Sequence, residues 1–434
     1  MFRILLSALL LLGMPLSAFA YPFAATPAQT FTTGNFPTDS VVADYNEDGI
    51  DDVVVISAVD RFITLYVGTN GTGLTESGTT SVPVGLGSVF GMTGGDFNND
   101  DNDDLVTSLG SDSYFFLGDG AGNFATSTAT GTSNAYKAAD FNNDGYDDLF
   151  FYSCSRGCFY ALGVNNQDDT FTFSLEASGA SNFLDAKAGL LNDDAFIDLV
   201  FAAENETDTY VLLGDGDGTF GAETATNEIA GEMRSLALAD ITGDGELDLV
   251  AHDDNATLNV VPGNGDGTFG TAVTYTADYT ISRVFAVDVT GDDVADVIAL
   301  HNANDRVSIF TNNGSGTLSE AQVLTVGDAP ESAAALDADD DGMIDLVVVN
   351  EDADSIMLFL GIEEPEDEEV EESDSGNTGR SRGGRVIRSG SGFRDLDRGG
   401  DQVTTMTRAD IEAQIVIVLQ QLIALLLEAV AERS

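Results

Sequence analysis

The chain has 434 residues, with 74 acidic and 16 basic side chains, which gives a formal net charge of −58 at pH 7. Charge of this sign and size repels phosphate backbones, so it argues against nucleic acid as a partner and favours cations or basic groups. Hydrophobic residues make up 43% of the chain, which is enough to build a core and excludes a wholly disordered protein.

The first 20 residues have the pattern of a signal peptide. Arg3 precedes an apolar run over residues 4–12, and Ala18, Phe19 and Ala20 form a small-x-small cleavage site. The run is too short for an ordinary transmembrane helix. We therefore predict cleavage after Ala20 and a secreted or cell-surface location for the mature protein.

An acidic stretch recurs seven times, with copies that start at Asp44, Asp96, Asp140, Leu190, Asp240, Asp288 and Asp337, about 49 residues apart. Two examples are "DFNNDGYDDL" and "DITGDGELDL". Each copy lies between two short apolar segments, and a polar hairpin, a third apolar segment and a fourth, more polar segment follow. Four strands per repeat predict an all-β fold, a seven-bladed β-propeller over residues 21–361. The acidic stretch then joins the first strand of each blade to the second.

The last repeat ends at "SIMLFLG", residues 355–361, and lacks a fourth strand. Residues 23–34, before the first acidic stretch, have the pattern of an isolated strand. We predict that this N-terminal strand completes the last blade, because pairing it there removes an unpaired sheet edge.

The acidic stretches, together with the turns "LGDGDGTF" (residues 213–220) and "GNGDGTFG" (residues 263–270), resemble the FG-GAP or VCBS repeat family. This family forms the seven-bladed propeller at the N-terminus of integrin α chains and in many secreted bacterial proteins. The resemblance covers roughly residues 23–361. It implies a calcium-stabilised propeller whose relatives mostly bind partners and only sometimes accompany an enzyme domain.

Each acidic stretch also has the oxygen spacing of a calcium loop, with ligands at positions 1, 3, 5, 7 and 9 counted from its first residue. In the third loop these are the side chains of Asp140, Asn142, Asp144 and Asp148 and the carbonyl of Tyr146. The corresponding residues elsewhere are Asp44, Asn46, Asp48, Ile50 and Asp52; Asp96, Asn98, Asp100, Asn102 and Asp104; Asn192, Asp194, Phe196 and Asp198; Asp240, Thr242, Asp244, Glu246 and Asp248; Asp288, Thr290, Asp292, Val294 and Asp296; Asp337, Asp339, Asp341, Met343 and Asp345.

We expect Ca²⁺ in about six or seven of these loops. Gly145 permits the sharp turn of the third loop, whereas Asp101 and Asp293 replace this glycine in the second and sixth. The fourth loop begins with Leu190 and has Ala195 in place of the glycine, so it is the weakest candidate. Acidic residues also decorate solvated turns, but that alternative does not explain why one spacing returns seven times.

Two cysteines, Cys154 and Cys158 in "CSRGC", favour a local disulfide in an exported protein. A metal pair or a redox motif is the alternative.

The basic residues of the repeat region indicate a possible ligand face opposite the calcium loops. Arg61, Arg156 and Arg306 fall on hairpins between second and third strands; Lys137, Lys187, Arg234 and Arg283 fall in or just after the connections between blades. They either form a partly basic patch for an acidic glycan or a protein carboxylate, or simply offset nearby aspartates such as Asp60, Asp185 and Asp305.

Catalytic motifs such as GxSxG, HExxH or a phosphate-binding glycine loop do not occur in the sequence. We therefore expect no enzyme, but a binding or adhesion module for an extracellular protein or glycan. The alternative is a secreted carbohydrate-active enzyme, a polysaccharide lyase or hydrolase, since a pair of carboxylates can do acid and base work.

Residues 362–408 are acidic and then rich in Arg and Gly, which predicts a disordered linker. Residues 409–434 have apolar side chains at steps of four and three, namely Ile411, Ile415, Val418, Leu422 and Leu425, which predicts an amphipathic helix. So apolar a helix should self-associate, attach to the cell envelope or a membrane, or dock onto the propeller.

Overall fold

The computed structural model describes residues 22–362, except residues 83–88, 110–111, 127–134, 154–158, 168–170, 178–182, 204–208, 227–232, 254–255, 313 and 315. Several predictions concern residues outside this part: the signal peptide at 1–20, the disulfide between Cys154 and Cys158, the position of Arg156, the linker from residue 363 on, and the helix at 409–434. The described part of the chain holds no helix with the length and apolarity needed to cross a membrane.

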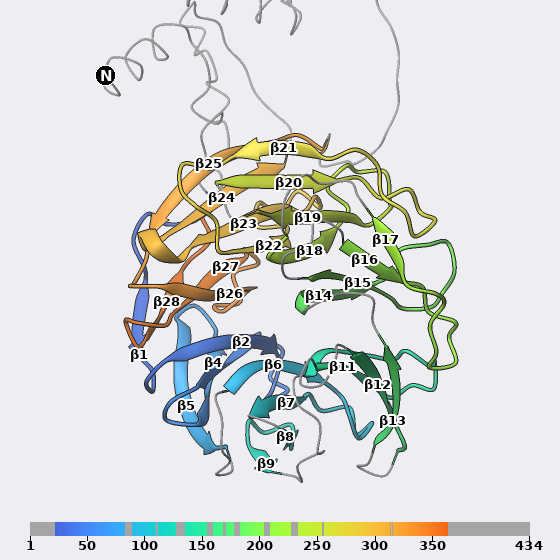
Figure 1. The fold of residues 1–434 in the computed structure, drawn as a ribbon. Helices are drawn as coiled ribbons and strands as arrows, with labels where there is room; N and C mark the ends of the chain where they lie inside the picture. Colours follow the sequence, from blue (N-terminus) through green and yellow to red (C-terminus); the bar gives the residue numbers. More distant parts are fainter. Residues whose placement is uncertain are drawn as a thin grey trace, which may run out of the picture. The chain divides into compact units, whose positions relative to one another are not determined.

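Seven four-stranded antiparallel sheets form the ring seen in Figure 1, which confirms the all-β, seven-bladed propeller. Blades 1 to 3 consist of β2 (Pro37–Ala43), β3 (Asp52–Ser57), β4 (Phe62–Thr69) and β5 (Gly73–Ser81); β6 (Val89–Gly95), β7 (Asp104–Leu109), β8 (Asp112–Gly118) and β9 (Phe124–Thr126); and β10 (Ala135–Ala139), β11 (Asp148–Ser153), β12 (Phe159–Asn165) and β13 (Phe171–Ala177).

Blades 4 to 6 consist of β14 (Phe183–Gly189), β15 (Asp198–Ala203), β16 (Thr209–Leu212) and β17 (Thr224–Thr226); β18 (Ser235–Ala239), β19 (Asp248–His252), β20 (Thr257–Val261) and β21 (Val273–Thr276); and β22 (Arg283–Val287), β23 (Asp296–His301), β24 (Arg306–Asn312) and β25 (Leu318–Thr325). A 3-10 turn, η2 (Asn302–Asn304), lies between β23 and β24. Blade 7 contains β26 (Pro330–Leu336), β27 (Asp345–Asn350) and β28 (Ser355–Phe359), with β1 (Gln29–Thr32) as its fourth strand.

The N-terminal strand closes the ring as the sequence predicts. β1 runs antiparallel to β28, with Gln29 opposite Leu358 and Thr32 opposite Ser355. Upstream of β1, Phe23 is fully buried between blades 6 and 7. The side chain of Gln322 holds its backbone, because Nε2 donates to the Phe23 carbonyl at 2.7 Å and Oε1 accepts from the Phe23 amide at 3.2 Å.

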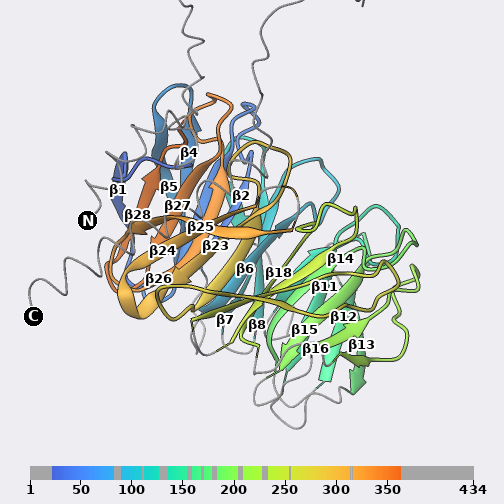
Figure 2. The ribbon, with the colours of Figure 1, turned by 90° about the horizontal axis from the view of Figure 1, so that it is seen from above.

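The hydrophobic core consists of seven clusters, each lying between two consecutive blades. The second strand of a blade supplies both of its flanking clusters: in β3, Val53 and Val55 pack against blade 7, while Val54 and Ile56 pack against blade 2. All six residues of β3 are buried, which explains its β-branched, almost continuously apolar sequence, DVVVIS. Figure 2 shows the blades stacked side by side in this way.

The first strands of the blades form the inner ring, because each of β2, β6, β10, β14, β18, β22 and β26 contacts the first strands of both neighbouring blades. The acidic loops follow these strands on one rim of the ring, and the strands begin at the other rim. Residues near the beginnings of the first strands therefore converge towards the axis, although they are far apart in the sequence.

Candidate functional site

Each acidic loop turns the chain from the first strand of a blade into the second, as predicted. Position 6 has a positive φ at Gly49, Gly145, Gly245 and Gly342, between 84° and 94°. Asp101 and Asp293 take the same region at φ of 68° and 65°, so aspartate replaces glycine without changing the turn. Ala195 of the fourth loop is not among the described residues with positive φ, and this turn differs from the other six.

The first-position carboxylate organises the turn. In the third loop, Asp140 accepts from the backbone amides of Asp144 at 3.1 Å and Gly145 at 2.9 Å. The aspartates that begin the first, second, fifth, sixth and seventh loops accept the equivalent pair of amides. Leu190 cannot do so, and its apolar side chain is 45% exposed.

Positions 5 and 7 have the same geometry in all seven loops. The fifth-position aspartate accepts from the backbone amide at position 7, with distances of 2.8–3.1 Å. The seventh-position residues are Ile50, Asn102, Tyr146, Phe196, Glu246, Val294 and Met343. Their side chains vary because the loop uses their backbone.

The ninth-position aspartate is buried in every blade and ties two strands together. Oδ1 of Asp148 accepts from the amide of Asn165 at 2.7 Å, at the end of the third strand, and Oδ2 accepts from Phe141 at 3.2 Å, just after the first. Five other blades repeat both hydrogen bonds. In blade 1, Oδ1 of Asp52 accepts from Gly68 at 2.9 Å, but its buried Oδ2 has no hydrogen-bond partner.

Burial raises the pKa of these carboxyls, although the backbone amides act in the opposite direction. The pKa rises to about 7 for Asp52, Asp104, Asp148 and Asp345 and to about 6 for Asp296, and it is also raised for Asp198 and Asp248. No positively charged side chain of the described residues compensates these seven buried carboxyls. A bound cation beside them would supply that charge.

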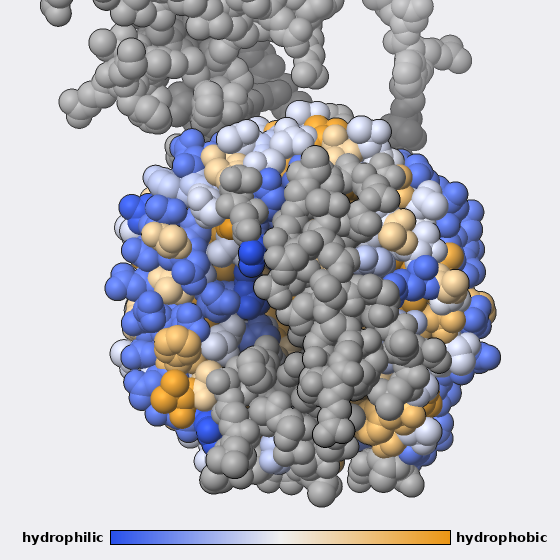
Figure 3. Space-filling model, viewed as in Figure 1, coloured by the Kyte–Doolittle hydropathy of each residue, from blue (hydrophilic) through white to orange (hydrophobic). Residues whose placement is uncertain are grey.

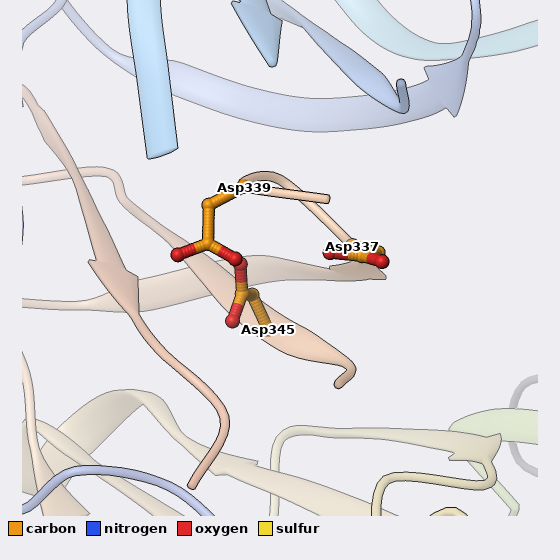
Figure 4. Close-up of side chains that lie close together, drawn as sticks. All are labelled: Asp337, Asp339 and Asp345. Carbon is orange, nitrogen blue, oxygen red and sulfur yellow. The ribbon is translucent and has the colours of Figure 1, made fainter. Parts of the chain in front are cut away.

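The seventh loop brings its acidic side chains together most closely. Carboxylate oxygens of Asp337, Asp339 and Asp345 lie within 4.8 Å of one another and face a common space (Figure 4). Oδ1 of Asp339 is buried there without a hydrogen-bond partner, and so is Oδ1 of Asn98 at the same position of the second loop. Convergent hard oxygens with unpaired lone pairs fit Ca²⁺, which takes six to eight oxygen ligands in flexible geometry.

Aspartates at position 8 of the first three loops reach towards the preceding blade, which the sequence analysis missed. Oδ2 of Asp51 accepts from the amide of Asp337 at 3.2 Å, so loop 1 touches loop 7. Burial, followed by the charge of Asp140, raises the pKa of Asp147 to about 6, while the amide of Asp96 in blade 2 acts to lower it. These contacts add carboxylates to neighbouring loops.

The turns after the third strands also pack against the loop of the preceding blade. Gly71 donates to the carbonyl of Asp339 at 2.6 Å, and Gly267 donates to that of Leu191 at 2.8 Å. The glycine-rich turns thus hydrogen-bond to the acidic loops of the preceding blades. The acidic rim therefore helps to hold neighbouring blades together.

On the other rim, six charged side chains meet near the axis; we call Asp39, Lys137, Asp185, Lys187, Arg283 and Glu331 the central charged cluster. They come from the innermost strands of blades 1, 3, 4, 6 and 7. Arg283 pairs with Glu331 at 2.8 Å and Lys187 with Asp185 at 3.0 Å. Burial opposes the charge of Arg283, but Glu331, Asp39 and Asp185 outweigh it and raise its pKa. Hydrophilic residues border the central hollow in Figure 3.

The remaining predicted cations lie outside this cluster. Arg61 is in the hairpin between β3 and β4, and Arg234 is exposed just before β18. Arg306 begins β24 and donates to the backbone carbonyl of Asp305 at 2.8 Å, not to its carboxylate. The structure therefore brings together only Lys137, Lys187 and Arg283 among the described members of the predicted ligand face.

Two members of the central charged cluster also fasten neighbouring blades. Oδ2 of Asp39 in blade 1 accepts from the amide of Met92 in blade 2 at 3.0 Å, and Oδ2 of Asp185 in blade 4 accepts from Leu236 in blade 5 at 2.9 Å. Asp39, Asp185 and Ser235 each lie five residues before the acidic loop of their blade. The hydroxyl of Ser235 in blade 5 accepts from the amide of Val284 in blade 6 at 3.3 Å. Comparing this position across the repeats would have revealed the polar series in the sequence.

The described chain is thus a seven-bladed propeller with an acidic loop at the same place in every blade. Its sequence matches the model of the FG-GAP-like repeat over residues 44–107, 191–251, 240–299 and 295–348. Together these segments cover about half of the chain, and the chain belongs to the FG-GAP-like repeat family, which confirms the resemblance. No curated protein sequence matches it significantly.

Several solved structures share the fold. BBS1N, solved in complex with ARL6DN, has a TM-score of 0.56 and 12% identity, covering 79% of this chain and 98% of its own. Sqt1 from Saccharomyces cerevisiae has a TM-score of 0.54 and 11% identity, covering 78% and 100%. A lectin from Agrocybe aegerita that recognises non-reducing terminal N-acetylglucosamine has a TM-score of 0.50 and 22% identity, covering 67% and 81%. At these identities the likeness concerns the fold alone.

Proposed function

We propose that this protein is an exported, calcium-stabilised propeller that acts as a binding or adhesion module for an extracellular protein or glycan. Ca²⁺ occupies six loops, all except the one that begins at Leu190. The ligand is bound on the rim opposite these loops. The helix at residues 409–434 adds self-association or attachment to the cell envelope.

The observation that carries the calcium proposal is the charge imbalance inside the loops. The ninth-position aspartates are buried with raised pKa values, and oxygens of Asp339 and Asn98 are buried without donors. Burying a carboxylate without a compensating charge is unfavourable, so a divalent cation that binds only the folded state should stabilise it by mass action.

The location of the ligand follows from how the two rims are built. The acidic loops already have a role within the fold. A turn of the next blade packs against them, and their carboxylates accept hydrogen bonds from backbone amides of the same blade. The opposite rim collects the protein's scarce cations beside carboxylates and hydroxyls. Mixed polar groups of this kind suit an extracellular ligand that offers both donors and acceptors.

Two measurements test the proposal. Calcium titration by calorimetry should give about six sites, and a chelator should lower the melting temperature strongly, while excess Mg²⁺ should restore little of it because Mg²⁺ demands stricter geometry. Absence of a calcium effect would refute the structural role. Glycan and extracellular-protein arrays, probed with the calcium-loaded chain, should identify a ligand; release of new chain ends from a polysaccharide would instead indicate a lyase or hydrolase.

A test of the predicted C-terminal helix uses the chain without residues 409–434. Light scattering should show a smaller particle than the full chain if the helix self-associates, whereas vesicle flotation of the full chain alone would indicate envelope attachment.

A further inference from the structure

The sequence contains two lysines, and both belong to the central charged cluster. Lys137 on β10 lies three residues before the third loop, and Lys187 on β14 lies three residues before the fourth. These are equivalent positions on neighbouring innermost strands. In a protein with a net charge of −58, the ring thus brings its two ammonium groups to one place.

Only one of the two ammonium groups is neutralised. Nζ of Lys187 donates to Oδ1 and Oδ2 of Asp185 at 3.1 and 3.0 Å. Lys137 makes no hydrogen bond or ion pair within the described part of the chain. Repulsion by Lys187, followed by burial, lowers the pKa of Lys137 to about 8, against the attraction of Asp185 and Asp39. Lys137 is therefore a partly buried cation whose three donors have no partner among the described residues.

The nearby carboxylates are already engaged. Besides Lys187, Asp185 accepts from the amides of Ala186 and Leu236 at 2.8 and 2.9 Å. Asp39 accepts from the amides of Ser40 and Met92 at 2.9 and 3.0 Å. Turning either carboxylate towards Lys137 would disturb a hydrogen bond that holds two blades together, so neither serves Lys137 in the described part of the chain.

Glu331, the third carboxylate of the cluster, is also engaged. It accepts from Arg283 at 2.8 Å and from Nδ2 of Asn302 at 3.1 Å. Lys187 and Arg283 are each paired to a carboxylate, so the Lys137 ammonium is the cation of the described cluster without an ion pair, and Asp39 is the carboxylate without one.

We propose that the central charged cluster binds a sugar acid whose carboxylate accepts hydrogen bonds from the Lys137 ammonium. This rests on the proposed binding function and specifies its ligand. A carboxylate supplies one charge and one acceptor group, whereas the acidic surface would repel a more highly charged anion. Sugar hydroxyls match the neighbouring hydroxyls of Ser40 and Ser332, whose Oγ atoms lie 3.0 Å apart beside Asp39.

A solute can reach this site. The side chains of Lys187 and Asp185 are 26% and 20% exposed, and those of Arg283 and Glu331 are 40% and 24% exposed. Because these side chains are partly exposed, a ligand can displace the water around them. Because they are also partly buried, a charge-assisted hydrogen bond to the ligand stays strong.

The test uses the calcium-loaded full chain with D-galacturonate as probe, D-galactose as uncharged control and N-acetyl-L-aspartate amide as a non-sugar carboxylate. Calorimetry gives affinities, and NMR of the lysine side chains reports on the site directly, since only two lysine signals exist. Lys137→Met removes the ammonium but keeps an apolar chain. Arg306→Met removes one positive charge outside the cluster and serves as the matched control.

Galacturonate should bind the unmodified chain and Arg306→Met equally, shift the Lys137 signal, and bind Lys137→Met at least tenfold more weakly, the loss expected for a charge-assisted hydrogen bond. Equal binding to Lys137→Met, or no binding to the unmodified chain, would overturn the proposal. Tighter binding of the aspartate probe than of galacturonate would overturn the sugar as ligand class. A ligand found on the arrays that is insensitive to Lys137→Met would leave the proposed binding function intact while refuting this site.

Discussion

Closure of the ring by the N-terminal segment gives the strongest test of the fold. A single buried phenylalanine, Phe23, contributes much of the packing at this closure. Phe23 is 0% exposed and packs in the cluster between blades 6 and 7, whereas Phe36, in the same N-terminal segment, is 41% exposed. Phe23→Ala leaves the backbone hydrogen bonds to Gln322 in place, so its effect comes from the lost ring. Truncating a buried phenylalanine costs about 3–5 kcal/mol, from the transfer of the side chain and the cavity left behind.

That loss is a large fraction of the roughly 5–15 kcal/mol by which folded domains are stable. Phe36→Ala should change the free energy of unfolding by less than about 1 kcal/mol, because its ring is largely in water already. Urea unfolding of both variants at a fixed calcium concentration measures the difference. If the two variants unfold at the same urea concentration, Phe23 is not packed in the closing blade and the argument for N-terminal closure fails.

Four further predictions concern the ring and its loops. A chain that starts at Thr38 lacks β1, which leaves the edge of β28 unpaired. Light scattering of this shorter chain should show aggregation. A monodisperse protein of normal stability would contradict the closure. Ser235→Ala removes a buried hydroxyl that joins three blades and should destabilise by about 1–3 kcal/mol in urea, whereas exposed Ser319→Ala should be nearly neutral. Asp345→Asn should abolish one calcium site in calorimetry, whereas Asp194→Asn in the fourth loop should leave the number of sites unchanged. With a chelator present, the melting temperature should rise as the pH falls from about 8 to about 5: the folded pKa of the ninth-position aspartates is raised above the unfolded value, so the folded state binds the extra protons. Calcium should weaken or reverse that trend, and an identical pH profile with and without calcium would contradict it.

The repeat made most of the fold predictable from sequence. The period near 49 residues, the order of four strands and the missing last strand specify seven blades and their closure. Asp101 and Asp293, which the sequence shows in place of the glycine, take the positive φ of the turn. These features are local or periodic, so each copy of the repeat repeats the same information.

The central charged cluster was only partly predictable. The sequence placed Lys137, Lys187 and Arg283 near the right rim, but not beside one another or paired with Asp185 and Glu331. Such residues are one to several repeats apart, and the angle between blades decides which of them meet. The hydrogen bond from the amide of Met92 to Asp39 likewise depends on how one blade packs on the next.

The sequence alone determined what each blade is: where its strands lie, which loop carries the oxygens, and that the N-terminal strand completes the ring. The tertiary structure decided which chemistry faces the axis, because closing seven similar blades brings one position from each into a common ring. The sequence determines the structure of one repeat, because its strands and turns depend on residues that are close together in the chain. Only closure places Lys137 beside Lys187, Asp185, Asp39 and Arg283, because these charged groups come from three other blades.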